Sequence, residues 1–147
     1  MRQALQEAEQ AFDEGEVPIG AVVVKDNRVV GRGHNQTERL GDPTAHAEIV
    51  AIGAAAAHFE SWRLTGGILY STIEPCVMCA GASVLSRLDR LVYGATDPKF
   101  GGCVSLFEIP SDQRLNHRIE MIGGIMAEQA AVLMRDFFVQ QRLKNAR

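Results

Sequence analysis

Apolar and polar positions along the chain repeat with two different periods, and each change of period marks an expected element. Residues 2–14 have the three-to-four spacing of an amphipathic helix. Its apolar positions are Ala4, Leu5, Ala8, Ala11 and Phe12. Two β-branched runs follow at residues 19–25 and 28–33, and the turn residues Asp26-Asn27 between them predict an antiparallel hairpin. The polar segment 34–43 is expected to be a loop.

Further along, the pattern alternates between helix and strand. It predicts an alanine-rich helix over residues 44–59, a strand over 67–73, a helix over 74–86 and a strand over 88–95. The irregular stretch 96–116 is too long for a simple connection, which indicates a functional loop. A last strand over 118–122 and a last helix over 127–144 complete the chain. The inward positions of the last helix are Ala130, Leu133, Met134 and Phe137.

This order of elements favours one architecture. A hairpin followed by strand-helix-strand crossovers predicts an α/β protein with a mixed five-stranded sheet and helices on both faces, a three-layer α/β/α sandwich. With 147 residues, 46% of them hydrophobic, the chain is long enough to bury one core. We therefore expect residues 1–147 to form a single domain.

Charge limits the classes of partner. A net charge of -3 and a pI near 5.8 argue against a protein that coats nucleic acid nonspecifically, because such binding needs many phosphate contacts. The charge is uneven, however: five acidic residues lie within residues 1–16, whereas residues 113–147 carry six basic residues against three acidic ones. Any polyanion is expected to dock near the C-terminal end.

Targeting signals and a disulfide framework are not expected. The apolar stretches near the start are interrupted by charges, so neither a signal peptide nor a membrane span is predicted. Three cysteines, two of them spaced C-x-x-C, fit metal-held thiolates in a reducing compartment better than disulfides in a secreted domain. These features predict a cytoplasmic protein, with Cys103 as a free thiol.

Two short motifs carry the candidate chemistry. His46-Ala47-Glu48 precedes Pro75-Cys76-Val77-Met78-Cys79 by about thirty residues. Cys76 and Cys79 are three apart at an expected helix start, where both sulfurs reach one ion and the helix dipole favours thiolate. With His46 they supply three zinc ligands and leave a fourth position open for water, whose pKa zinc lowers to roughly 7.

Each motif alone has other interpretations. A lone C-x-x-C can be a redox pair or half of a structural zinc site, and a structural site would need a fourth ligand. The remaining soft side chains have no chelating spacing: Cys103, His34, His58 and His117. The conjunction of H-x-E with P-C-x-x-C is the specific signal, because it is the signature of zinc deaminases that act on bases.

Glu48 completes the chemistry. It lies two residues from His46, close enough to contact the zinc-bound water without being a ligand. We expect it to take a proton from that water, deliver it to a ring nitrogen as hydroxide attacks the amino-bearing carbon, and help to protonate the departing ammonia.

Over almost its whole length the sequence resembles the bacterial tRNA-specific adenosine deaminases, which convert adenosine to inosine at the wobble position of an arginine tRNA anticodon. The matching segments are residues 16–22, 34–35, 42–49, 74–82, 93–99, 116–118 and 136–138. The resemblance implies a cytidine deaminase-like fold, one Zn²⁺ per chain, a tRNA anticodon loop as substrate and a homodimer. The apolar run Val77-Met78 with residues 80–85 is a candidate for the dimer interface, although core burial explains it equally well.

The resemblance also implies roles for residues around the base. Asn35 would hydrogen-bond the flipped base, and Ile19 and the backbone around Glu74 would line its pocket. Asp97 and Lys99 would meet the ribose and backbone of the target nucleotide. The same residue types also occur in ordinary turns, so chemistry alone does not choose between the two interpretations.

The C-terminal helix is a candidate RNA contact. Phe137 and Phe138 are adjacent and cannot share one face, so one should pack and the other lie exposed near Arg142, a pattern suited to stacking a loop base beside phosphates.

Two other functions stay open at this stage. A deaminase of a free base or nucleoside, such as guanine or a cytosine compound, would share the zinc motifs but would not need the basic last helix. A noncatalytic zinc module that binds RNA would have no need of Glu48.

Overall fold

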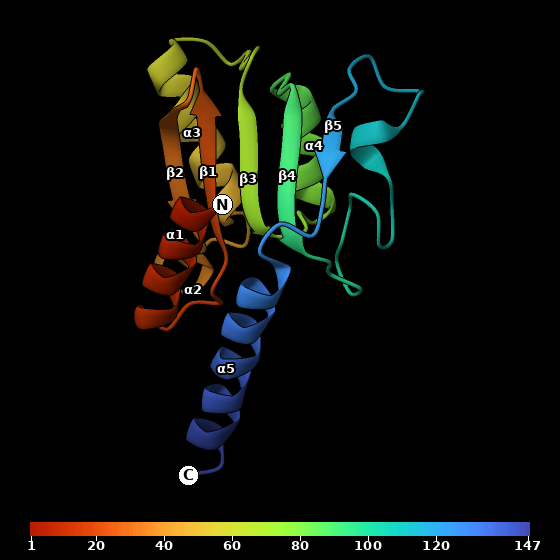
Figure 1. Cartoon of the computed structure of the whole chain (residues 1–147). Helices are drawn as coiled ribbons and strands as arrows, with labels where there is room; N and C mark the ends of the chain where they lie inside the picture. Colours follow the sequence, from red (N-terminus) through yellow and green to blue (C-terminus); the bar gives the residue numbers. More distant parts are fainter.

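The computed structural model describes residues 1–147 as a sheet sandwiched between helices (Figure 1). The elements in chain order are α1 (Arg2–Asp13), β1 (Gly20–Lys25), β2 (Arg28–His34), α2 (Thr37–Leu40), α3 (Ala47–Phe59), β3 (Ile68–Ile73), α4 (Val77–Leu85), β4 (Arg90–Ala95), the 3₁₀ turn η1 (Ile109–Ser111), β5 (Glu120–Ile122) and α5 (Ala127–Asn145).

The five strands form one mixed sheet in the order β2-β1-β3-β4-β5. β1 is antiparallel to β2 and β3, whereas β3, β4 and β5 are parallel. α1 and α5 cover one face and α3 and α4 the other (Figure 1). The predicted three-layer α/β/α sandwich is therefore confirmed, and its main core lies between the sheet and the α3–α4 layer.

The hairpin forms where the sequence predicts it. Asp26 and Asn27 both have positive φ, 50° and 62°, which is the backbone of a two-residue type I′ turn whose twist matches that of the flanking strands. This turn fixes the pairing of β1 with β2.

Glycines in β2 bring α3 close to the sheet. A Cβ on Gly33 would lie 2.4 Å from the carbonyl oxygen of Ala47, and a Cβ on Gly31 would lie 2.3 Å from that of Ala51. No larger residue fits without displacing α3. Because the start of α3 carries His46 and Glu48, this contact helps to set where the candidate ligands lie.

Several predicted boundaries differ from the structure. α3 begins at Ala47 rather than at residue 44, and α4 covers only Val77–Leu85 rather than 74–86. The predicted loop 34–43 contains the one-turn helix α2, whose first N–H groups are satisfied from a distance: the buried Glu16 carboxylate accepts hydrogen bonds from the backbone of Glu38 at 3.1 Å and Arg39 at 2.6 Å. The sequence of residues 34–43 alone does not predict this contact with Glu16.

The last helix packs through its first half and projects beyond the sheet (Figure 1). Ala130 and Phe137 are buried, as predicted, whereas Leu133 and Met134 are only partly covered. Phe137 packs edge-to-face against Phe12 of α1, with ring centroids 5.8 Å apart. None of the helices combines the length and apolar composition needed to cross a membrane.

Candidate metal centre and active site

His46, Cys76 and Cys79 converge where two helices begin. His46 and Cys76 are the N-cap residues of α3 and α4 and have extended backbones, and Cys79 lies in the first turn of α4. Both sulfurs lie 3.5 Å from His46 Nδ1, and the three candidate ligand atoms are all within 4.8 Å of one another. This group can hold a metal ion.

The spacing suits zinc. Zn–S bonds of about 2.3 Å and Zn–N bonds of about 2.0–2.1 Å at a tetrahedral angle require sulfur and nitrogen to be roughly 3.6 Å apart. The two sulfur–nitrogen distances of 3.5 Å agree with that value. Two thiolates and one imidazole also form a donor set that zinc prefers, with one tetrahedral position left for water or substrate.

The ligands influence one another's protonation. The hydrogen bond from Cys79 lowers the pKa of Cys76 to about 4, helped by His46, whereas the same contact and burial raise the pKa of Cys79. The hydrogen bond with Cys76 raises the pKa of His46. Metal binding requires both thiols to be deprotonated and the imidazole to be neutral, so a bound cation would displace protons from this group.

Glu48 lies beside this group, 3% exposed, in the first turn of α3. Its carboxylate is held from the sheet: Ser71 Oγ of β3 lies 2.7 Å from Glu48 Oε1 and 2.8 Å from the carbonyl oxygen of Ile73. Sequence reasoning missed Ser71, because no spacing within the chain relates it to Glu48.

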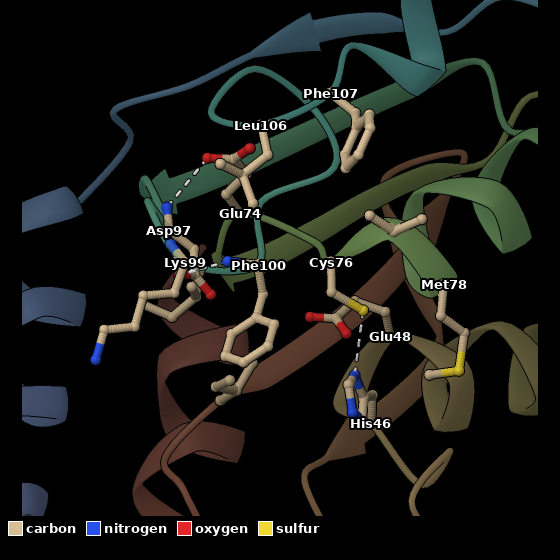
Figure 2. Close-up of a pocket in the computed structure, with 13 residues that line it drawn as sticks. His46, Glu48, Glu74, Cys76, Met78, Asp97, Lys99, Phe100, Leu106 and Phe107 are labelled. Atoms are coloured by element: carbon tan, nitrogen blue, oxygen red, sulfur yellow. Dashed lines mark hydrogen bonds between the residues drawn. The ribbon is translucent and has the colours of Figure 1, made fainter.

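A cavity of about 580 Å³ opens over these residues, within the usual size range of ligand pockets. Its 13 lining residues include the predicted Ile19, His46, Glu48, Glu74, Cys76, Asp97 and Lys99 (Figure 2). A smaller adjoining cavity of about 210 Å³ is lined by Asn35 together with Ile19, His46 and Glu48.

Asn35 is buried beside this smaller cavity, and its backbone N–H donates to the carbonyl oxygen of Ile19 at 3.0 Å. The residue before it is anchored to α1: His34 Nδ1 lies 3.1 Å from Glu7 Oε2, and His34 Nε2 lies 2.9 Å from Glu14 Oε2. The end of β2 is therefore held both by the backbone of Ile19 and by side chains of α1 and its C-cap.

Two residues expected to contact substrate are engaged within the protein. Asp97 Oδ1 accepts hydrogen bonds from the backbone N–H groups of Lys99 at 3.0 Å and Phe100 at 3.3 Å, so one carboxylate oxygen closes a turn. The Glu74 carboxylate points into the loop after β4 rather than into the cavity (Figure 2). Burial acts to raise the pKa of Glu74, but the hydrogen bonds from Ser105 and the loop backbone prevail and lower it.

The C-terminal residues lie outside both cavities. Phe137 is 6% exposed, so it is the phenylalanine of the pair that packs, and its buried ring is not available to a substrate. Phe138 is 43% exposed and Arg142 is also exposed, which leaves this pair open to a ligand. Cys103 is a free, fully buried thiol, and burial raises its pKa to about 12.

Sequence reasoning also missed the apolar wall of the large cavity. Phe100, Leu106 and Phe107 line it and are more than half exposed (Figure 2). The only signal in the sequence was the length of the loop from residue 96 to residue 116, which indicated function but not which side chains would matter.

Known proteins with the same sequence pattern and fold define the class. Residues 1–142 match the family model of the MafB19-like deaminases. A tRNA-specific adenosine deaminase of Streptococcus pyogenes serotype M18 (strain MGAS8232) is 47% identical over 99% of this chain and 93% of its own length. A tRNA-specific adenosine deaminase of Aquifex aeolicus (strain VF5) is 44% identical over 99% of this chain and 94% of its own length.

A solved structure from work on A-to-I editing by tRNA:A34 deaminases at the wobble position of transfer RNA superposes with a TM-score of 0.87 at 44% identity. It covers 90% of this chain and 96% of that one. Fold and site together therefore define a deaminase. Within that class, the chain belongs to the family of tRNA-specific adenosine deaminases.

Proposed function

We propose that the protein hydrolytically deaminates adenosine to inosine at the wobble position of a tRNA anticodon, with one Zn²⁺ held by His46, Cys76 and Cys79. One observation carries the proposal: the three side chains are spaced for zinc, and two of them, His46 and Cys76, line the same cavity as Glu48. The family relationship supplies the substrate class.

The chemistry assigned to this chain's own residues is proton transfer. A zinc ion in this donor set supplies an activated water molecule at neutral pH. Glu48 would take the first proton of the water as its oxygen bonds to C6 of adenine and pass it to N1. It would then carry the second proton from the new C6 hydroxyl to the amino nitrogen, whose bond to C6 breaks as ammonia leaves. Ser71 orients the carboxylate for these transfers through the 2.7 Å contact with Glu48 Oε1.

The cavities suggest how the nucleotide is held. We assign to the Asn35 amide a hydrogen bond with the everted base, and to Ile19 an apolar contact with its ring, since both residues line the smaller cavity next to Glu48. Lys99 and the free oxygen of Asp97 lie at the rim of the larger cavity, where ribose and phosphate would pass. Phe138 and Arg142 form a second contact with the anticodon loop by stacking and by charge.

A homodimer is part of the proposal. Val77 and Leu85 are 45% and 70% exposed, and Gly81 between them leaves open space, so one stripe of α4 is apolar and uncovered. Ala80 and Val84 of the same run are buried in the core. The exposed stripe would be covered by the same stripe of a second copy. Because the substrate is tRNA, we place the activity in the cytoplasm.

The decisive experiment offers the zinc-loaded protein an anticodon stem-loop with adenosine at the wobble position and measures inosine. A matched stem-loop with adenosine only in the stem, free guanine and free cytidine are tested in parallel. Inosine formed only at the wobble position supports the proposal. Ammonia released from guanine or cytidine without inosine would assign the site to a free base or nucleoside, and no turnover with any substrate would favour a noncatalytic zinc module.

A further inference from the structure

The apolar wall of the candidate active-site cavity belongs to a loop that is held by backbone contacts with Pro75 and Cys76 and by the carboxylate of one buried side chain. Residues 97–107, called here the wall loop, contribute five of the cavity's lining residues. These are Asp97, Lys99, Phe100, Leu106 and Phe107. Phe100, Leu106 and Phe107 are 52–66% exposed, so their own packing gives the loop little stability.

The tie is the carboxylate of Glu74, which is 2% exposed. Its Oε1 accepts hydrogen bonds from the N–H of Asp97 at 3.0 Å and from the hydroxyl of Ser105. Its Oε2 accepts three more, from the N–H groups of Cys103 at 3.2 Å, Val104 at 2.9 Å and Ser105 at 3.0 Å. All five donors belong to the wall loop, and no protein cation takes part.

The loop is shaped to receive this carboxylate. A Cβ on Gly101 would lie 2.3 Å from Glu74 Oε2, so only glycine leaves room for it. Gly101 also pairs with Cys76 in an isolated bridge, and the Gly102 N–H donates to the carbonyl oxygen of Pro75 at 2.8 Å. The wall loop is thereby aligned against the segment that carries a candidate zinc ligand.

We propose that Glu74 is a positioning residue: its carboxylate clamps the wall loop through five hydrogen bonds, with Gly101 making room, and so presents the apolar wall to the substrate. The clamp acts on substrate binding rather than on proton transfer, because none of its donors touches Glu48 or the zinc ligands. The role of the wall in substrate binding rests on the proposed function. That Glu74 holds the wall loop in place does not.

The chemistry requires a carboxylate. Four N–H groups and one O–H group converge on two oxygens that carry a full negative charge. Glutamine has the same shape, but it keeps only one of the two acceptor oxygens. Its amide NH₂ would face N–H donors. Glu74→Gln therefore leaves several donors unpaired in a buried position, with little change of volume.

The experiment compares Glu74→Gln with Glu108→Gln, which makes the same chemical change at an exposed glutamate just beyond the wall loop. Three quantities are measured: zinc content, KM and kcat with the anticodon stem-loop, and the rate of trypsin cleavage after Lys99, which lies in the wall loop. We expect Glu74→Gln to retain zinc and kcat within about threefold, to raise KM at least tenfold, and to accelerate cleavage after Lys99 at least tenfold. Glu108→Gln should behave as wild type.

Gly101→Ala tests the clamp from the other side, because the added methyl displaces the Glu74 carboxylate without removing its charge. It should reproduce the rise in KM and the faster cleavage. An unchanged KM and cleavage rate in Glu74→Gln would overturn the proposal. A loss of zinc with a matching fall in kcat would also overturn it, because Glu74 would then support the metal centre instead of the wall loop. If wild type fails to act on the stem-loop, the proposed function fails, and the cleavage rates alone decide whether Glu74 holds the loop.

Discussion

The two sides of the active-site cavity are built in different ways. The floor, with His46, Glu48 and Cys76 and the buried Cys79 next to them, comes from the starts of two helices that pack against the sheet. The wall, with Phe100, Leu106 and Phe107, comes from a loop whose apolar side chains face outward. The floor is fixed by the core of the protein, whereas the wall is held by hydrogen bonds to the Glu74 carboxylate, by the backbone of Pro75 and by the buried Cys103.

Because of this difference, we expect the reaction and the recognition of the substrate to respond to mutations on different sides of the cavity. The backbone of the candidate ligands is fixed by the packing of α3 and α4 against the sheet, so their positions are set by the core. A loop with few buried apolar contacts opens at a lower free energy than the core does and can be changed with little effect on the fold. Mutations in the floor should therefore alter rate or metal content, and mutations in the wall or at the C-terminal helix should alter affinity.

The largest effect is expected in the floor. Glu48→Gln removes the proton acceptor but none of the metal ligands, so turnover of the stem-loop should fall by about 10²–10⁴ while zinc content and stem-loop affinity stay unchanged. Single-turnover assays and metal analysis measure the two quantities. Glu9→Gln on the exposed side of α1 is the matched control. Near-normal turnover in Glu48→Gln would show that another group moves the proton.

The next effect separates two adjacent phenylalanines. Phe137→Ala removes a buried ring from its contact with Phe12 and should lower the free energy of unfolding by about 3 kcal/mol. Phe138→Ala should change stability by less than about 1 kcal/mol but weaken stem-loop binding roughly 5- to 150-fold, the equivalent of about 1–3 kcal/mol of base stacking. Urea unfolding and binding titrations measure the two. Equal effects of both variants on affinity would contradict this division.

A smaller effect is expected at Ser71. Ser71→Ala leaves the Glu48 carboxylate without the hydroxyl at 2.7 Å, so kcat should fall about tenfold, as for the loss of one hydrogen bond to a charged group. KM should not change. Ser86→Ala, which removes another buried hydroxyl away from the cavity, is the control. A rise in KM with constant kcat would mean that Ser71 acts on the substrate instead.

The smallest effect is a pH dependence at the junction that supports Asn35. The hydrogen bond from His34 lowers the pKa of Glu14 below its ordinary value of about 4.5. A carboxyl group whose pKa is lower in the folded state stabilises the fold above its unfolded pKa, and this contribution is lost as the pH falls through the folded pKa. Wild type should therefore be more stable than Glu14→Gln at pH 6, and the difference should shrink below about pH 4.5. Urea unfolding of both proteins at pH 6, 5 and 4, in the same metal state, tests the trend.

The floor could be anticipated from the sequence because its residues obey local rules. Cys76 and Cys79 are brought together by helix spacing, and the H-x-E motif places Glu48 beside His46. The strand order and the two layers of helices likewise followed from hydrophobic period and turn residues. Even here the helix starts were set too early, because His46 and Cys76 are caps with extended backbones rather than helical residues.

The wall could not be anticipated, because its determinants are far apart in sequence. Glu74 contacts donors 23 to 31 residues away, and Ser71 contacts Glu48 across 23 residues. A buried carboxylate that organises a loop looks the same in a sequence as a surface one, and so Glu74 was expected to serve the substrate through its backbone alone. The choice between Phe137 and Phe138 likewise depended on where Phe12 of α1 lies.

The packing of α1 against α5 has a consequence for how such proteins diversify. The two terminal helices pack on the opposite face of the sheet from α3 and α4, and the C-terminus lies beyond the sheet at the end of α5 (Figure 1). Beyond Phe137 the last helix contains no buried residue, so its final two turns can change in length or charge with little strain transmitted to the core. Evolution can therefore vary the end of this helix without altering the first turns of α3 and α4, which hold the candidate ligands.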